Sequence, residues 1–101
     1  MNDYYLEQSD DNKHKYMVYF VNPQTKNVNT IRFGAKNMND YTITGDDEAK
    51  KRYIKRHQVN EDFGNLKKKA PWSLFLLWNK KSLKASIKDM EERFNIKIHT
   101  V

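Results

Sequence analysis

Residues 15–33 read KYMVYFVNPQTKNVNTIRF, two runs of β-branched and aromatic side chains on either side of an Asn-Pro turn signal. Such runs, bounded by turn residues, predict strands. We therefore expect Lys15–Val21 and Val28–Phe33 to form a β-hairpin with a six-residue loop. Successive side chains of a strand alternate between its faces, so Ile31 and Phe33 share one face, which we expect to point into the core.

A two-stranded hairpin is marginal by itself, so helices must cover one side of it. Residues 44–47 read TGDD, which matches a capping box and predicts a helix over about Asp46–Gln58. Acidic side chains begin this helix and basic ones end it, as the helix macrodipole favours. The loop-like segment 34–44 precedes it. There we expect Asp40 to form an Asx turn and Gly34 to relieve backbone strain rather than to bind an anion.

Two more helices are predicted after a loop over residues 59–70. The first, about Pro71–Asn79, reads PWSLFLLWN, and its apolar character on every side places it at the centre of the core. The second, about Leu83–Phe94, has an apolar stripe at helical spacing and Ser82 as its cap. Residues 95–101 alternate apolar and polar side chains, which allows a short third strand. The predicted class is therefore α+β: an N-terminal β-hairpin packed by about three helices.

The charge of the 101-residue chain is divided unevenly. The chain has 19 Lys and Arg against 13 Asp and Glu, a net charge of +6. Residues 1–12 hold four acids and no Lys or Arg, so they carry −4 and residues 13–101 carry +10. We expect an acidic N-terminal tail over 1–12 and a single small basic domain over 13–101. The acidic composition of the tail favours a frayed, solvated terminus. Tyr4, Tyr5 and Leu6 would also let the tail lie on the basic body or on another subunit.

Composition excludes several classes of protein. With no cysteine, the chain has no disulfides, no Cys-bearing zinc site and no thiol catalysis. The N-terminus lacks the pattern of a signal peptide, and the longest apolar run, Leu74–Trp78, is far shorter than the ~20 residues of a membrane span. We therefore expect a soluble protein of a reducing compartment. The apolar fraction is low, so the core is expected to be thin and a partner surface could add to its stability.

The basic residues cluster on the first predicted helix and in the loop that follows. Cations along one helix face can neutralise phosphates, which positions a protein on nucleic acid without reading sequence. The cations near the other two helices would extend this patch if those helices pack against the first. A Lys-rich helix face can also be merely solvated. The candidate nucleic-acid-binding residues are Lys50, Lys51, Arg52, Lys55, Arg56, Lys67, Lys68, Lys69, Lys80, Lys81 and Lys84.

Aromatic and acid–base residues offer two further hypotheses. Tyr53, His57 and Trp72 could stack on unpaired bases, although the apolar segment around Trp72 also fits a core position. His57 could work with Asp40 or Glu61 in metal binding or acid–base catalysis. The chain has no His-x-x-x-His pair, glycine-rich phosphate loop or nucleophile motif. We therefore expect no enzyme, no cofactor and no metal site, with His57 in a structural role.

Five stretches taken in order resemble an uncharacterised family of small basic proteins encoded by large nucleocytoplasmic, giant-type DNA viruses. They are FGAK over Phe33–Lys36, DYT over Asp40–Thr42, RYIKRH over Arg52–His57, LWNK over Leu77–Lys80 and SLKASIKDMEERF over Ser82–Phe94. The resemblance covers about residues 15–94 and leaves the acidic tail outside. It implies an origin and no mechanism, since that family carries no assigned activity. The segment between Gly64 and Trp72 looks shorter and richer in lysine than the family pattern.

These observations predict a non-enzymatic small viral protein whose basic helix face and Lys-rich loop bind a polyanion, most plausibly nucleic acid without sequence specificity. The alternative is a virion or capsid-associated structural protein. Such a protein would dock on acidic viral proteins or on copies of itself through its acidic tail and basic body. The expected location is the host cytoplasm, a virus factory or the nucleus, or the virion.

Overall fold

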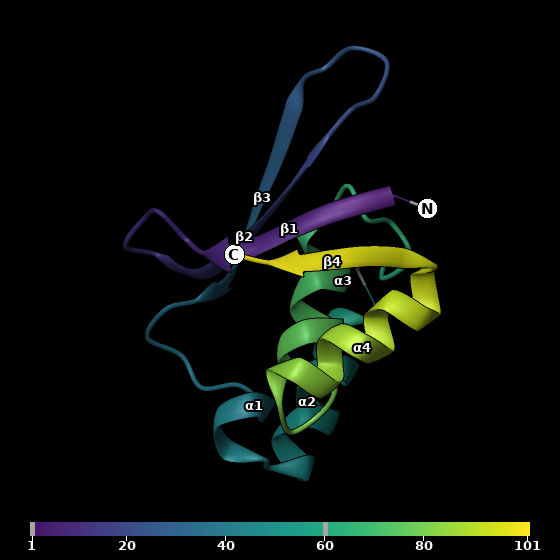
Figure 1. Cartoon of the computed structure of the whole chain (residues 1–101). Helices are drawn as coiled ribbons and strands as arrows, with labels where there is room; N and C mark the ends of the chain where they lie inside the picture. Colours follow the sequence, from purple (N-terminus) through teal and green to yellow (C-terminus); the bar gives the residue numbers. More distant parts are fainter. Residues whose placement is uncertain (1, 60) are drawn as a thin grey trace.

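The computed structural model describes residues 2–59 and 61–101 (Figure 1). Its strands are β1 (Asn2–Gln8), β2 (His14–Val21), β3 (Val28–Ala35) and β4 (Ile96–Thr100). Its helices are α1 (Tyr41–Thr44), α2 (Asp47–His57), α3 (Lys69–Trp72), the π-helix η1 (Ser73–Leu77) and α4 (Leu83–Phe94). The strands form one sheet in the order β3-β2-β1-β4, and the helices lie together on one side of it (Figure 1). The α+β class is confirmed.

The predicted hairpin is the β2–β3 pair. These strands are antiparallel, with Val18 opposite Ile31 and Tyr16 opposite Phe33. Phe33 is fully buried and Ile31 packs against the core, so the predicted inward face is confirmed. The far end of the hairpin projects beyond the rest of the molecule (Figure 1).

The N-terminal segment is part of this sheet. β1 lies between β2, its antiparallel neighbour, and β4, its parallel neighbour. Tyr4 and Leu6 are buried in the core. The expectation of a frayed, solvated terminus is therefore wrong for Asn2–Gln8, which lies on the basic body. Asp3, Tyr5 and Glu7 are more exposed than Tyr4 and Leu6, and this alternation of burial is that of a strand with one buried face.

Helix α2 lies within one residue of each predicted boundary, but its cap differs from the prediction. The N-cap is Asp46, whose Oδ1 accepts hydrogen bonds from the amides of Glu48 and Ala49. Thr44 is therefore not the capping residue. The segment 34–44, expected to be a loop, contains the one-turn helix α1. The Asx turn at Asp40 is confirmed, because Asp40 Oδ1 accepts from the Thr42 amide at 2.9 Å and caps α1.

The two C-terminal helices follow the predicted order. The apolar segment forms α3, which begins at Lys69 within the expected loop, and continues into η1. Helix α4 has the predicted boundaries, and its cap Ser82 accepts from the Ala85 amide at 3.1 Å. The C-terminal strand is confirmed as β4.

The core lies between the sheet and the helices. Its fully buried side chains include Val18 and Phe33 from the sheet, Trp72 and Leu76 from the central helices, and Met90 from α4. Gly34, at the end of β3, has a φ of +78°. A Cβ atom there would lie only 2.6 Å from Leu77 Cδ1, so close packing of η1 on the sheet requires glycine at this position.

Among the residues that the structure describes, no helix has both the length and the apolar composition to cross a membrane.

Candidate polyanion-binding site

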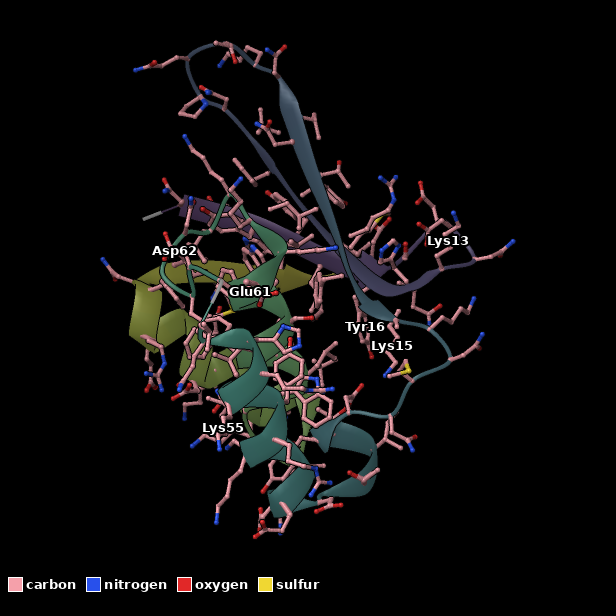
Figure 2. All side chains as sticks on the ribbon, turned by 180° about the vertical axis from the view of Figure 1, so that it is seen from behind. Lys13, Lys15, Tyr16, Lys55, Glu61 and Asp62 are labelled. Carbon is pink, nitrogen blue, oxygen red and sulfur yellow. The ribbon has the colours of Figure 1, made fainter. Side chains whose placement is uncertain are left out.

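A cleft of about 440 Å³ lies where residues around the start of β2 and the end of β3 face α2. In Figure 2, Lys13 and Lys15 lie on one side of this region, and Lys55 of α2 lies on the other. The start of α3 and residues of η1 also line the cleft. Its charged and histidine side chains are Lys13, His14, Lys15, Asp40, Arg56, His57, Glu61 and Lys69.

Three of the cations in the cleft are available to a ligand. Lys13, Arg56 and Lys69 are exposed, and none has a carboxylate within 4.0 Å among the described residues. They come from the turn before β2, the last turn of α2 and the first residue of α3. The fold therefore brings together positive charges that are distant in the sequence, and their potential favours an anion in the cleft.

The fourth cation, Lys15, is used within the protein. Its Nζ lies 2.5 Å from Asp40 Oδ2, and both side chains are largely buried. Asp40 also accepts hydrogen bonds from the amide and the hydroxyl of Thr42. This pair ties α1 and the segment before it to the sheet and adds no net charge to the cleft.

The wall of the cleft formed by α2 and the segment around η1 contains aromatic rings. The rings of Tyr53 and Trp78 stack with centroids 4.6 Å apart and planes 7° apart, and the His57 ring lies 4.2 Å from Tyr53. His57 Nδ1 lies 3.0 Å from Glu61 Oε1. Burial raises the pKa of Tyr53, and a hydrogen bond with Ser73 lowers it by a smaller amount. Tyr53 therefore keeps a neutral hydroxyl at pH 7.

Asp40 and His57, considered together from the sequence, do line one cleft. Their hydrogen bonds go elsewhere, Asp40 to Lys15 and Thr42, and His57 to Glu61. No three His, Asp or Glu side chains gather as a metal site in residues 2–59 and 61–101.

The eleven predicted residues do not form one patch. Lys50 Nζ donates to the Asn79 carbonyl at 2.6 Å and lies 4.9 Å from the centre of the Tyr41 ring, so this lysine is a packing residue. Lys51 lies 3.6 Å from Glu48. Lys80, Lys81 and Lys84 follow η1, at the opposite end from Lys69, and Lys84 lines a separate hollow on α4.

Three of the predicted lysines lie near Asp47. A hydrogen bond from Tyr41 is the main cause that lowers the pKa of Asp47, and the charges of Lys81, Lys50 and Lys51 lower it further. These lysines therefore lie near a carboxylate. Of the eleven predicted residues, Arg56 and Lys69 line the cleft. Arg52, Lys55 and Lys68 are exposed and lie close to them in the sequence, whereas Lys67 lines a separate hollow beside the start of β1 and the end of β2.

The aromatic hypothesis needs correction at Trp72. This ring is fully buried and its Nε1 donates to the Leu66 carbonyl at 3.1 Å, so the prediction that it stacks on bases is wrong. Tyr53 is also buried, which leaves Trp78 as the half-buried aromatic residue of this wall.

Sequence analysis missed two features. Lys13 is distant from the other cations in the sequence, and only the fold places it in the cleft. The sheet face away from the helices carries a row of stacked rings: Tyr5 and Tyr19 have centroids 5.5 Å apart, and Tyr5 and His99 4.9 Å apart. Asp3 Oδ1 lies 3.0 Å from His99 Nε2 at the end of the row. Residues 2–8 read NDYYLEQ, and the three adjacent apolar side chains give no clear period-two signal for this face.

The fold and site define a small α+β protein with a cationic cleft. Residues 4–57 match a family of unknown function, DUF5754, and the chain belongs to that family. The matched segment runs from β1 to the end of α2 and includes Lys13 and Arg56, while Lys69 lies outside it. No curated protein and no solved structure matches the chain.

Proposed function

We propose that this protein binds a polyanion, nucleic acid in particular, without catalysing a reaction. The observation that carries the proposal is the convergence of Lys13, Arg56 and Lys69 on one cleft, none with a carboxylate partner among the described residues. The exposed Arg52 and Lys55 on α2 and Lys68 before α3 adjoin these residues in the sequence and add to the positive charge. Regularly spaced phosphates are the ligand that such a surface fits, and contacts of this kind carry no sequence information.

The salt dependence of binding tests the proposal. If Lys13, Arg52, Lys55, Arg56, Lys68 and Lys69 contact phosphates, six contacts give a slope of roughly −5 on duplex DNA. Fluorescence anisotropy with duplex and single-stranded DNA and RNA should then show about a 10³-fold loss of affinity for duplex DNA between 50 and 200 mM salt. Absence of binding at 50 mM salt would overturn the proposal, and so would equal affinity at the two salt concentrations.

A charge-reversal pair locates the surface. Lys55→Glu with Arg56→Glu places two acids beside the cleft, and we expect binding to weaken at least tenfold at 50 mM salt because two phosphate contacts become repulsive. Lys80→Glu with Lys81→Glu is the matched control, with the same charge change at the other end of η1. Circular dichroism should show that both double variants remain folded. Equal losses in the two variants would contradict the assignment to the cleft.

We further propose, from the resemblance of the five motifs, that the chain is viral and acts in the host cytoplasm, a virus factory or the nucleus.

The alternative function is a structural one in the virion. It is favoured by Val21 and Val28, which are paired and exposed at the projecting end of the β2–β3 hairpin and offer a docking point there. Docking through the acidic tail is less favoured, because Asp3, Asp10 and Asp11 contact His99, Arg32 and His14 of the same chain. Proteomics of purified particles together with light scattering tests this alternative, which a strict monomer absent from particles would exclude.

A further inference from the structure

We infer that the cleft is a pocket for one nucleotide unit, in which the cations hold the phosphate and the apolar wall holds the base. The inference rests on the proposed function in taking nucleic acid as the source of the phosphate, and it goes further by naming the unit bound. The unit is a nucleoside monophosphate, either free or at the end of a strand.

Size and charge both fit this ligand. A cleft of about 440 Å³ falls within the range of roughly 300–1,000 Å³ of small-molecule sites. Its four cations, Lys13, Lys15, Arg56 and Lys69, face two carboxylates, Asp40 and Glu61, so the lining carries +2 when its histidines are neutral. A phosphate monoester carries about −1.5 to −2 at pH 7, which matches this charge.

The two kinds of lining give the ligand an orientation. Arg56 offers a planar guanidinium that can hold two phosphate oxygens at once, and Lys69 and Lys13 add point charges. Apolar side chains line the same cleft, among them Met38, Leu77 and the half-buried Trp78. A flat base packed against these side chains would be removed from water, while its phosphate would remain bound to the exposed cations. A bare anion gains only the second of these contacts, and a nucleoside only the first.

Isothermal titration calorimetry of the full chain with adenosine and uridine monophosphates, at 50 mM salt, tests the inference. We expect the nucleotides to bind at least tenfold more tightly than the nucleosides and than inorganic phosphate. Oligonucleotides with and without a terminal phosphate then separate a free nucleotide from a strand end: a tenfold preference for the phosphorylated end identifies the strand end. Nucleotides that bind no better than nucleosides would overturn the inference.

Matched variants locate the pocket. Lys69→Gln and Arg56→Gln remove cations of the cleft, and each should weaken nucleotide binding about tenfold. Lys80→Gln and Lys81→Gln remove exposed cations at the other end of η1 and should change binding less than twofold. Equal effects of Lys81→Gln and Lys69→Gln would overturn the assignment of the pocket. Trp78 gives an independent signal, because the other tryptophan, Trp72, is fully buried. Nucleotide should quench tryptophan fluorescence in the wild type, and Trp78→Phe should abolish this quenching.

The two proposals fail separately. Long nucleic acid that binds in a salt-dependent way, without measurable binding of mononucleotides, would overturn the pocket and leave the proposed function. Mononucleotides that bind in the cleft while long strands do not would overturn the proposed function and support the pocket.

Discussion

At the scale of single residues, the shape of the cleft depends on lining groups that are bound or packed within the protein. Lys15 and Asp40 form a largely buried ion pair, and Gly34 lets η1 approach the end of β3. These groups hold in place the walls that carry Lys13 and Arg56. Their contribution is therefore expected to appear in stability rather than in binding chemistry.

Lys15→Met should lower the free energy of unfolding by about 3 kcal/mol, because it leaves the Asp40 carboxylate buried without its cation. Urea unfolding measures this change, and Lys97→Met on the exposed side of β4 is the control, expected to change stability by under about 0.5 kcal/mol. Adding Asp40→Asn to Lys15→Met should recover part of the loss, since the unpaired charge is then removed. Equal effects of the two lysine variants would show that the pair does not stabilise the fold.

Gly34→Ala should destabilise the protein by roughly 2–4 kcal/mol, from the left-handed backbone conformation and from the overlap of the new Cβ with Leu77. Gly64→Ala is the matched control. Its φ is not positive, and the nearest atom to a Cβ there is Asp62 Oδ1, at 3.4 Å. Thermal melts of the two variants measure the difference, and similar melting temperatures would contradict this reading of Gly34.

At the scale of secondary structure, the sequence predicts those elements whose residues carry a clear local pattern. The hairpin, α2 and α4 follow from alternation, helical spacing and capping residues such as Ser82. β1 escapes prediction because the acids of residues 1–12 suggest a solvated terminus and the adjacent Tyr4, Tyr5 and Leu6 show no clear alternation. The π-turn of η1 and the parallel pairing of β1 with β4 depend on tertiary packing, which no local pattern reports.

The inner position of β1 has a measurable consequence. Leu6→Ala removes a buried side chain from the strand between β2 and β4, and it should cost about 2–5 kcal/mol of stability. Glu7→Ala, the next residue on the same strand, is less buried and should cost under about 1 kcal/mol. Urea unfolding of both variants tests the role of β1. If Leu6→Ala unfolded at the same urea concentration as the wild type, the strand would not be part of the cooperative core.

At the scale of the whole molecule, the net charge of +6 includes cations that are paired within the protein. Asp10, between β1 and β2, pairs with Arg32 of β3, and Asp89 pairs with Arg93 within α4. Most exposed cations of the described residues remain unpaired, and the cleft is where cations from three separate elements line one hollow. The sequence lists the basic residues, but only the fold shows which of them line the cleft and lack a carboxylate partner among the described residues.

Acid should destabilise the protein below about pH 4. Hydrogen bonds from Arg32 to Asp10, from His14 to Asp11, from Tyr41 to Asp47 and from Asn79 to Asp89 are the main causes that lower the pKa values of these four carboxyls. A lowered folded-state pKa means that the unfolded chain binds protons more readily, so this stability is complete above the unfolded value near 4 and is lost as the pH falls through the folded values.

Thermal melts between pH 2 and pH 7 measure this dependence. Asp89→Asn should have a lower melting temperature than the wild type at pH 7, and the difference should shrink as the pH falls, because the wild-type carboxyl progressively gains a proton. A difference that stays constant with pH would assign the effect of the substitution to packing rather than to charge.

The parallel pairing of β1 with β4 also bears on how the chain acquires its structure. β1 is synthesised well before residues 96–100, which complete the sheet beside it, and the Val101 amide donates to the Leu6 carbonyl at 2.9 Å. Until these residues leave the ribosome, one edge of β1 exposes unpaired amides and carbonyls, an arrangement that invites pairing with other chains. Nascent chains stalled before residue 96 should therefore be the species that aggregates or requires a chaperone, and folding should be slowed by this contact of high sequence separation.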